Sequence, residues 1–253
     1  MMPEAPFDPL RDAKDRPARK SVSPEPVAPA NSVDSAEADE ARTAVAGRVR
    51  YRGAGDPLFG FIIAAALSVG LTPLLPDSVE LRYTLAWGAL AGVSVLSWLL
   101  GNMERIGQER PENLGWGILY ALMLGIPFLV FLSRIVLSPA ADRLFPGMSS
   151  GSLLAFLVFV MPIAETLFFR GLLQGQLAFW LVGLLATVWN IVLFFPVMWG
   201  AVTELPAVTS VIVVLLLMMN LLFVYVRERN GLAAAWVCQI VANLIILYIP
   251  FLQ

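Results

Sequence analysis

Residues 207–226 read AVTSVIVVLLLMMNLLFVYV, twenty residues in which every side chain is uncharged. About 20 apolar residues in an α-helix are needed to cross the roughly 30 Å hydrocarbon core of a bilayer. The whole chain has a matching composition, because 58% of its 253 residues are hydrophobic and only 14% are charged. Soluble globular chains carry about 25% charged residues. The sequence therefore predicts an integral membrane protein.

Six further apolar stretches of similar length flank this one, at 57–76, 83–101, 114–137, 152–175, 178–199 and 232–252. Their apolar runs are continuous rather than alternating, which favours helices over a β-barrel. We therefore expect an all-α fold, a polytopic transmembrane helical bundle of about seven spans. Three of the spans fall in residues 56–150, and four form a core in residues 151–253.

The first 55 residues differ in composition from the rest. They carry 9 of the 17 Lys and Arg residues and 9 of the 19 Asp and Glu residues, and they are rich in Pro, Ala and Ser. Such a segment buries too little apolar surface to offset the entropy of ordering it. We therefore expect residues 1–55 to form a disordered cytoplasmic tail.

The placement of Lys and Arg predicts the orientation in the membrane. With seven spans, nine of these residues near the spans fall on the side of the N-terminus and three on the other side. The more basic side normally faces the cytoplasm. We expect a multi-pass protein of the cytoplasmic (inner) membrane, surrounded by lipid, with its N-terminus in the cytoplasm. The side of the C-terminus depends on whether the fourth and fifth spans both cross fully.

The residue inventory excludes several kinds of chemistry. The chain has no histidine and a single cysteine, Cys238. These counts exclude His-based general base catalysis, Ser-His-Asp triads and the usual zinc ligand sets, so we expect no metal and no cofactor. A net charge of −2 gives no basic surface for nucleic acid.

One acidic residue, Glu165, lies inside the fourth predicted span, where an ionisable side chain costs at least a few kcal/mol. Arg170 is five residues away, which on an α-helix is about 140° around the axis and makes a poor partner. Pro162 should kink the helix beside the carboxylate. In the last span Gln239 and Asn243 are spaced by four and share one helix face. We expect an internal polar site in which an unpartnered Glu165 tolerates substitution by Gln.

Asn190 in the fifth span and Asn220 in the sixth are candidates for interhelical hydrogen bonds. A purely structural role is the alternative for all of these amides, because Asn and Gln commonly join transmembrane helices.

The string Glu165-Thr-Leu-Phe-Phe-Arg170-Gly-Leu-Leu-Gln-Gly resembles the first motif of the CAAX-protease and bacteriocin-processing family of intramembrane proteases. That motif consists of two adjacent glutamates, three variable residues and an arginine. The second motif of the family is Phe, three residues and His, and the fifth span has Phe195 followed by Trp199. The resemblance covers about residues 150–253.

The third motif of the family is His, three residues and Asn or a similar residue, and the last span has Gln239 and Asn243 at this spacing. The resemblance implies that Glu165 matches the general base of an intramembrane endopeptidase. It likewise implies that Arg170 matches the motif arginine and Asn243 an oxyanion donor.

Three positions depart from the family pattern. Thr166 stands for the second glutamate, and Trp199 and Gln239 stand for the two histidines. An amide can still donate to an oxyanion, whereas an indole N–H cannot accept a proton. Because a positioned acid or base contributes about 10²–10⁴ in rate, these losses predict little peptidase activity.

The sequence therefore favours a divergent, catalytically inactive family member that acts as a membrane binding or scaffold protein. Gln239, Trp199, Thr166 and Phe195 would help to line a pocket for a transmembrane or lipid-modified protein segment. One alternative is an active glutamic-type intramembrane endopeptidase. Another is a small structural subunit of a larger membrane complex, with other chains of that complex as partners.

Overall fold

The computed structural model describes residues 57–99, 110–197 and 199–253, and every regular element in these ranges is a helix. The predicted tail at 1–55 lies outside the described residues. The α-helices are α2 (Pro57–Leu74), α3 (Val79–Leu99), α4 (Glu112–Leu132), α5 (Ser138–Leu144), α6 (Ser150–Ala155), α7 (Met161–Glu165), α8 (Phe179–Phe194), α9 (Trp199–Glu204), α10 (Pro206–Asn230), α11 (Leu232–Asn243) and α12 (Ile249–Phe251). The π-helices are η1 (Ser133–Leu137), η2 (Phe156–Val160), η3 (Thr166–Leu173) and η4 (Leu244–Tyr248).

The predicted helical bundle is confirmed, and each of the seven predicted apolar stretches contains a helix. Five helical runs among the described residues are long and apolar enough to cross a membrane: Pro57–Leu74, Glu112–Leu144, Ser150–Leu173, Pro206–Asn230 and Leu232–Phe251. α3 has 21 residues but carries Glu80 and Arg82 near its start. α8 is apolar but has only 16 residues, which is about 24 Å of helix.

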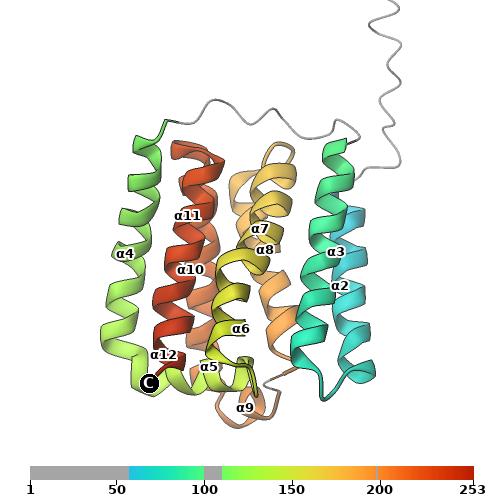
Figure 1. The fold of residues 1–253 in the computed structure, drawn as a ribbon, viewed down its shortest axis with the longest axis vertical. Helices are drawn as coiled ribbons and strands as arrows, with labels where there is room; N and C mark the ends of the chain where they lie inside the picture. Colours follow the sequence, from blue (N-terminus) through green and yellow to red (C-terminus); the bar gives the residue numbers. More distant parts are fainter. Residues whose placement is uncertain (1–56, 100–109, 198) are drawn as a thin grey trace, which may run out of the picture. The chain divides into compact units, whose positions relative to one another are not determined.

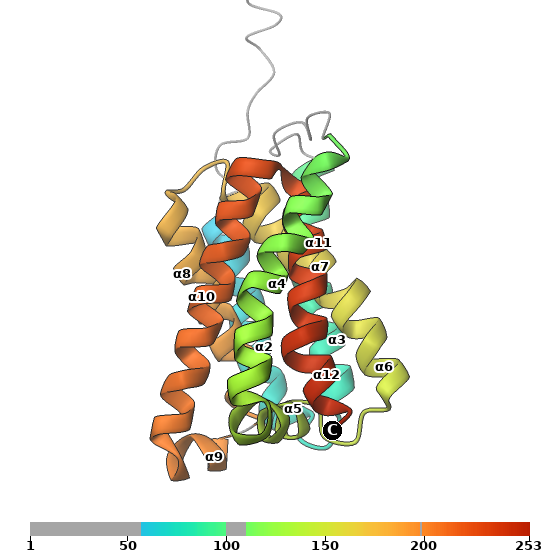
Figure 2. The same ribbon diagram turned by 90° about the vertical axis from the view of Figure 1, so that its left-hand side faces the viewer.

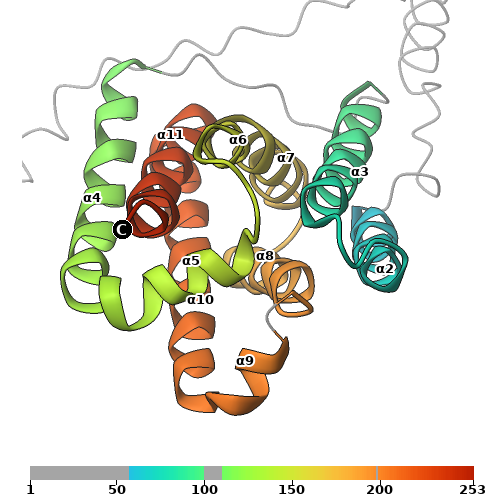
Figure 3. The ribbon, with the colours of Figure 1, turned by 60° about the horizontal axis from the view of Figure 1, so that its bottom comes forward.

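Successive long helices run in alternating directions, as Figures 1 and 2 show. The chain descends Figure 1 in α2, returns in α3, descends in α4 and returns through α6, η2, α7 and η3. It descends again in α8, returns in α10 and descends through α11 to the C-terminus. α5 lies crosswise at the end of the bundle where the C-terminus lies (Figure 3).

α4 packs closely against α11 and η4, and glycine makes this approach possible. A Cβ atom at Gly117 would overlap the carbonyl oxygen of Ala234, and one at Gly125 would lie 2.8 Å from a methyl carbon of Ile245. Small residues let transmembrane helices approach closely, so that van der Waals packing replaces the hydrophobic effect that lipid cannot supply.

An aromatic cluster joins α3 to η2, to α8 and to the residue that follows α5. Its rings have centroids 5.2–6.2 Å apart and belong to Tyr83, Trp87, Phe145, Phe156 and Phe194. The hydroxyl of Tyr83 donates to the carbonyl of Leu144 at 2.9 Å. α3 also packs against α7 and η3, across the predicted boundary at residue 150, and the division into 56–150 and 151–253 stays a prediction.

The helical run from Ser150 to Leu173 changes its winding three times, from α6 to η2, from η2 to α7 and from α7 to η3. η2 ends directly before α7, whose second residue is Pro162, and η3 follows directly after Glu165. Proline has no N–H to donate to the preceding turn, and π-turns are rare insertions that often accompany functional sites. Pro162 thus lies in a short α-helical turn with π-helical segments on both sides, and the kink expected there stays a prediction.

Candidate functional site

Glu165 and Arg170 are both inside the bundle, with 1% and 0% of their surface exposed. The angle of 140° expected from the sequence applies to an α-helix, but Arg170 lies in the π-helix η3. In a π-helix the hydrogen bonds join residues five apart, as in the 3.0 Å bond from Gln174 N–H to the Phe169 carbonyl. Arg170 therefore follows Glu165 by one π-turn, and both side chains face the interior.

The carboxylate of Glu165 accepts hydrogen bonds from three side chains on three other helices. Oε1 accepts from Trp87 Nε1 at 3.2 Å and from Asn190 Nδ2 at 2.9 Å. Oε2 accepts from Gln239 Nε2 at 2.7 Å. These bonds occupy three of the roughly four acceptor positions of a carboxylate. All three partners are donors, a pattern that matches the acceptor-only, ionised form of a carboxylate.

The guanidinium of Arg170 donates to two amide oxygens. Nη1 donates to Gln239 Oε1 at 3.2 Å, and Nη2 donates to Asn220 Oδ1 at 3.0 Å. The ring of Phe223 lies 5.1 Å from the guanidinium carbon, close enough for a cation–π interaction. Thr166 Oγ1 also donates to Gln239 Oε1, at 3.0 Å.

Asn220 Nδ2 donates to Asn190 Oδ1 at 2.9 Å, and this bond closes a loop of five side chains. We call this loop the amide ring, and its members are Glu165, Gln239, Arg170, Asn220 and Asn190. Among the described residues no direct ion pair joins the two charges. Gln239 alone connects them on one side, and two asparagines connect them on the other.

The three amides of the amide ring are all oriented in the same sense between the two charges. Every amide turns its oxygen toward the guanidinium and its NH₂ toward the carboxylate, along both routes. Turning over any one amide would bring two donors together and two acceptors together. The charges therefore fix the orientation of all three amides, and the ring joins α7 and η3 to α8, α10 and α11.

A cavity of about 40 Å³ lies beside the amide ring, and its lining includes Glu165, Asn190 and Asn243. Asn243 is fully buried and its Nδ2 lies 3.6 Å from the sulfur of Met161. Its Oδ1 is buried and has no hydrogen-bond partner in the described part of the chain. The cavity can hold small molecules of the size of water, which occupies about 30 Å³ in the liquid.

Residues 148–245 match the family model of the Type II CAAX prenyl endopeptidase Rce1-like proteins. This match starts directly before α6 and ends within η4, and it includes all five members of the amide ring. Residues 148–245 are therefore similar to proteins of this family, and we call them the CAAX-protease-family domain after this match. A search of the curated proteins and a search of the solved structures found no match.

Within the CAAX-protease-family domain, the structure brings most of the candidate residues together. Glu165, Arg170, Thr166 and Gln239 are joined by hydrogen bonds. Asn243 lines the adjoining cavity, one helical turn beyond Gln239, and half-buried Phe195 lines that cavity too.

Trp199 is not brought to this site. It lies at the start of α9 with 62% of its surface exposed, and it does not line the cavity. The helix α8 ends at Phe194 rather than continuing to 199 as expected from the sequence. Phe195 and Trp199 therefore do not share the continuous helix on which their motif spacing was interpreted.

Trp87 was not predicted from the sequence, although it donates directly to Glu165. It lies on α3, outside the CAAX-protease-family domain and 78 positions before the carboxylate. It is one of seven tryptophans, and no local pattern distinguishes it from the others. Asn190 and Asn220 were predicted to bond between helices, and they do so as part of one closed ring.

Proposed function

We propose that this chain is a membrane-embedded CAAX-protease-like protein without peptidase activity, which serves as a binding or scaffold protein. The observation that carries the proposal is the closed amide ring around Glu165. A general base must reach the proton that it removes, directly or through one water. Here the carboxylate is engaged by an indole and two amides, all of which donate.

The size of the neighbouring cavity supports the same proposal. Sites for small ligands have volumes of about 300–1,000 Å³, and a peptide segment needs at least as much. The cavity beside Glu165 has about 40 Å³. Hydrolysis of a peptide at Glu165 would therefore require several helices to separate, and the amide ring joins those same helices.

The residues at the two histidine positions of the family add a chemical argument. Gln239 is held between both charges by its amide, and Trp199 is exposed on α9. Neither side chain can exchange a proton near neutral pH. Glu165 therefore lacks the second titratable group that would exchange protons with it during peptide hydrolysis.

Peptidase activity is tested with the purified full-length chain and a panel of membrane-tethered and prenylated peptides. We expect no turnover above that of Glu165→Gln under identical conditions. Turnover that disappears in Glu165→Gln would overturn the proposal in favour of an active glutamic-type endopeptidase. Equal background turnover in the unmodified chain and in Glu165→Gln would support the proposal.

The binding role and the place in the cell are tested separately. We propose a multi-pass protein of the cytoplasmic membrane, with its N-terminus in the cytoplasm and with lipid and one or more membrane protein segments as partners. Reporter fusions that fold only in the cytoplasm should be active at the N-terminus. Mild detergent extraction and mass spectrometry should identify either a stoichiometric chain, as in a subunit of a complex, or a substoichiometric partner.

A further inference from the structure

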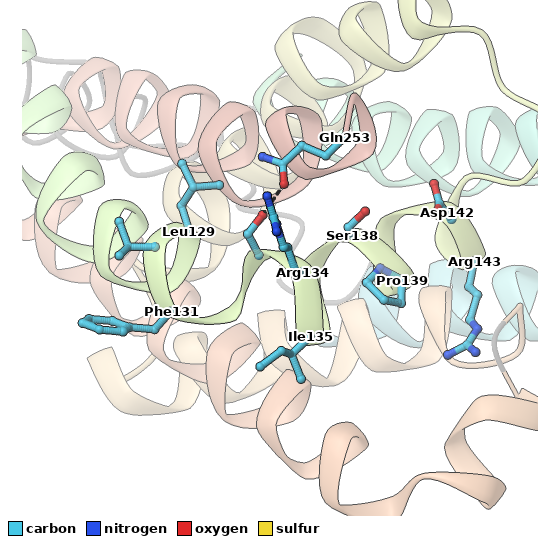
Figure 4. Close-up of a pocket in the computed structure, with 11 residues that line it drawn as sticks. Leu129, Phe131, Arg134, Ile135, Ser138, Pro139, Asp142, Arg143 and Gln253 are labelled. Carbon is cyan, nitrogen blue, oxygen red and sulfur yellow. Dashed lines mark hydrogen bonds between the residues drawn. The ribbon is translucent and has the colours of Figure 1, made fainter.

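A large surface hollow lies at the end of the bundle that carries α5, away from the amide ring. Its volume is about 1120 Å³, and it lies between the end of α4, η1, α5 and the C-terminal residue Gln253. Figure 4 shows Arg134 and Arg143 on either side of Ser138 and Pro139 in this hollow. The hollow therefore presents two guanidinium groups and a hydroxyl at one end of the membrane-spanning helices.

Of the charged side chains that line the hollow, two are cationic and one is acidic, which favours an anion. Arg134 and Arg143 are exposed, and neither forms an ion pair with another residue that the structure describes. The one acidic side chain of the lining, Asp142, points to the opposite side of α5 from Arg143 (Figure 4). Guanidinium groups bind phosphate oxygens through charge-assisted, often bidentate hydrogen bonds.

The other wall of the hollow is apolar and faces outward. Val130, Phe131 and Ile135 have 68%, 75% and 72% of their surface exposed, as expected for side chains that contact lipid tails. Polar and apolar walls thus meet along one edge, at the level where the long helices end and α5 crosses them (Figure 3). Phospholipid headgroups occupy this level of a bilayer.

A second, narrower groove continues from the hollow between α5 and the start of α10. Its volume is about 210 Å³, and it shares Ile135, Pro139 and Arg143 with the hollow. Along α10 it extends from Leu205 to Ile212, which is about 10 Å at 1.5 Å per residue. The hydrocarbon of one leaflet is about 15 Å thick, so the groove can follow an acyl chain through most of a leaflet.

The inner end of the groove adjoins the site already described. Ala140 and Ile212 line both the groove and the cavity beside Glu165. A chain lying in the groove would therefore pack against the wall of that cavity.

We propose that the hollow and the groove form a binding site for one anionic glycerophospholipid. The phosphate binds the guanidinium groups that line the hollow, the headgroup hydroxyls face Ser138, and one acyl chain occupies the groove between α5 and α10. A glycerophospholipid carries an anionic head and an apolar chain in one molecule, and the bilayer supplies it next to the site. Guanidinium groups at this level can bind the phosphate of such a lipid through charge-assisted hydrogen bonds. The site is the same in an active or an inactive protein.

The first test uses the purified full chain in a neutral detergent, with phosphatidylglycerol, phosphatidylcholine or inorganic phosphate added. Phosphatidylglycerol should raise the unfolding midpoint at about tenfold lower concentration than phosphatidylcholine, a ratio expected from charge-assisted hydrogen bonds. Inorganic phosphate should have no effect. Arg134→Gln with Arg143→Gln should abolish the difference between the lipids. The matched control is Arg110→Gln with Arg229→Gln, which removes two exposed guanidiniums elsewhere and should leave the difference unchanged.

The second test locates the acyl chain without a variant. Phosphatidylglycerol with a photoactivatable group in one acyl chain should label peptides of α5 and of the first half of α10. Labelling of α2 is the control for random contact with bulk lipid. Its side chains Phe59 and Ile62 are 63% and 60% exposed. Equal effects of both lipids, an unchanged difference in the Arg134 and Arg143 variant, or labelling of α10 no stronger than that of α2 would each overturn the proposal.

Discussion

Neutralising Glu165 or Arg170 alone should lower the free energy of unfolding strongly, because the charge of the other residue then stays buried without a counter-charge. In Glu165→Gln the guanidinium remains buried without a counter-charge, and removing one partner of a buried pair costs about 3–5 kcal/mol. If the new side-chain oxygen keeps the bonds from Trp87 and Asn190, its NH₂ meets the Nε2 of Gln239, which lies 2.7 Å from the present Oε2. Gln239 cannot turn over, because its oxygen would then leave Arg170. The structure therefore reverses the sequence-based expectation that Glu165→Gln is tolerated.

The double variant separates the charge effect from simple loss of packing. Arg170→Gln leaves the carboxylate unpaired and should also cost about 3–5 kcal/mol. Glu165→Gln with Arg170→Gln removes both charges of the amide ring, so we expect it to cost no more than the worse single variant. The double-mutant cycle should then give a coupling energy of about 3 kcal/mol, at the upper end for residues in one network.

The assay is unfolding of the purified protein by titration with sodium dodecyl sulfate, followed by circular dichroism and tryptophan fluorescence. Glu228→Gln with Arg229→Gln is the matched control, because both side chains are exposed at the end of α10. Exposed pairs contribute about 0–1 kcal/mol, so this cycle should show little coupling. The reasoning is refuted if the Glu165 and Arg170 effects are additive to within about 0.5 kcal/mol.

Three further predictions use the same unfolding assay. Gly117→Ala should destabilise the protein, because its Cβ would overlap the backbone of α11, whereas Gly115→Ala, with nothing within 4 Å, should be neutral or stabilising by up to about 1 kcal/mol. Asn243→Leu should be neutral or stabilising, since the unpartnered Oδ1 carries a desolvation penalty of about 1–3 kcal/mol; a large loss would mean that this oxygen has an essential partner. Trp87→Phe removes one donor to the carboxylate and should cost about 1–3 kcal/mol. Trp199→Phe, at an exposed position, should change stability by less than about 0.5 kcal/mol.

The helices were predictable from the sequence because lipid imposes a simple rule on them. A span must be apolar for about 20 residues, and each such stretch contains a helix in the structure. The ends were less predictable. The predicted fifth stretch continues to 199, but α8 ends at Phe194 and α9 begins at Trp199, since apolarity alone does not distinguish a turn from a helix at the end of a span.

The candidate site was predictable only where its geometry is local. Gln239 and Asn243 share a face because four residues nearly complete one α-helical turn. That Glu165 and Arg170 both face the interior was not predicted, because no sequence pattern indicated the π-helix η3. Trp87 was missed because its partner lies on another helix, 78 residues away.

The three amides explain how two opposite charges coexist inside this bundle without a direct ion pair. An ionised residue in a membrane interior needs both a counter-charge and hydrogen bonds for its remaining polar atoms. A single amide can meet both needs at once, because it accepts from the cation and donates to the anion. Gln239 does so at a position where the family resemblance places a histidine, and an imidazole there would change its donor pattern on gaining a proton. A glutamine has the same donors and acceptors at every physiological pH. In this chain, which contains no histidine at all, the amide ring is therefore a fixed connection between helices and not a path for protons.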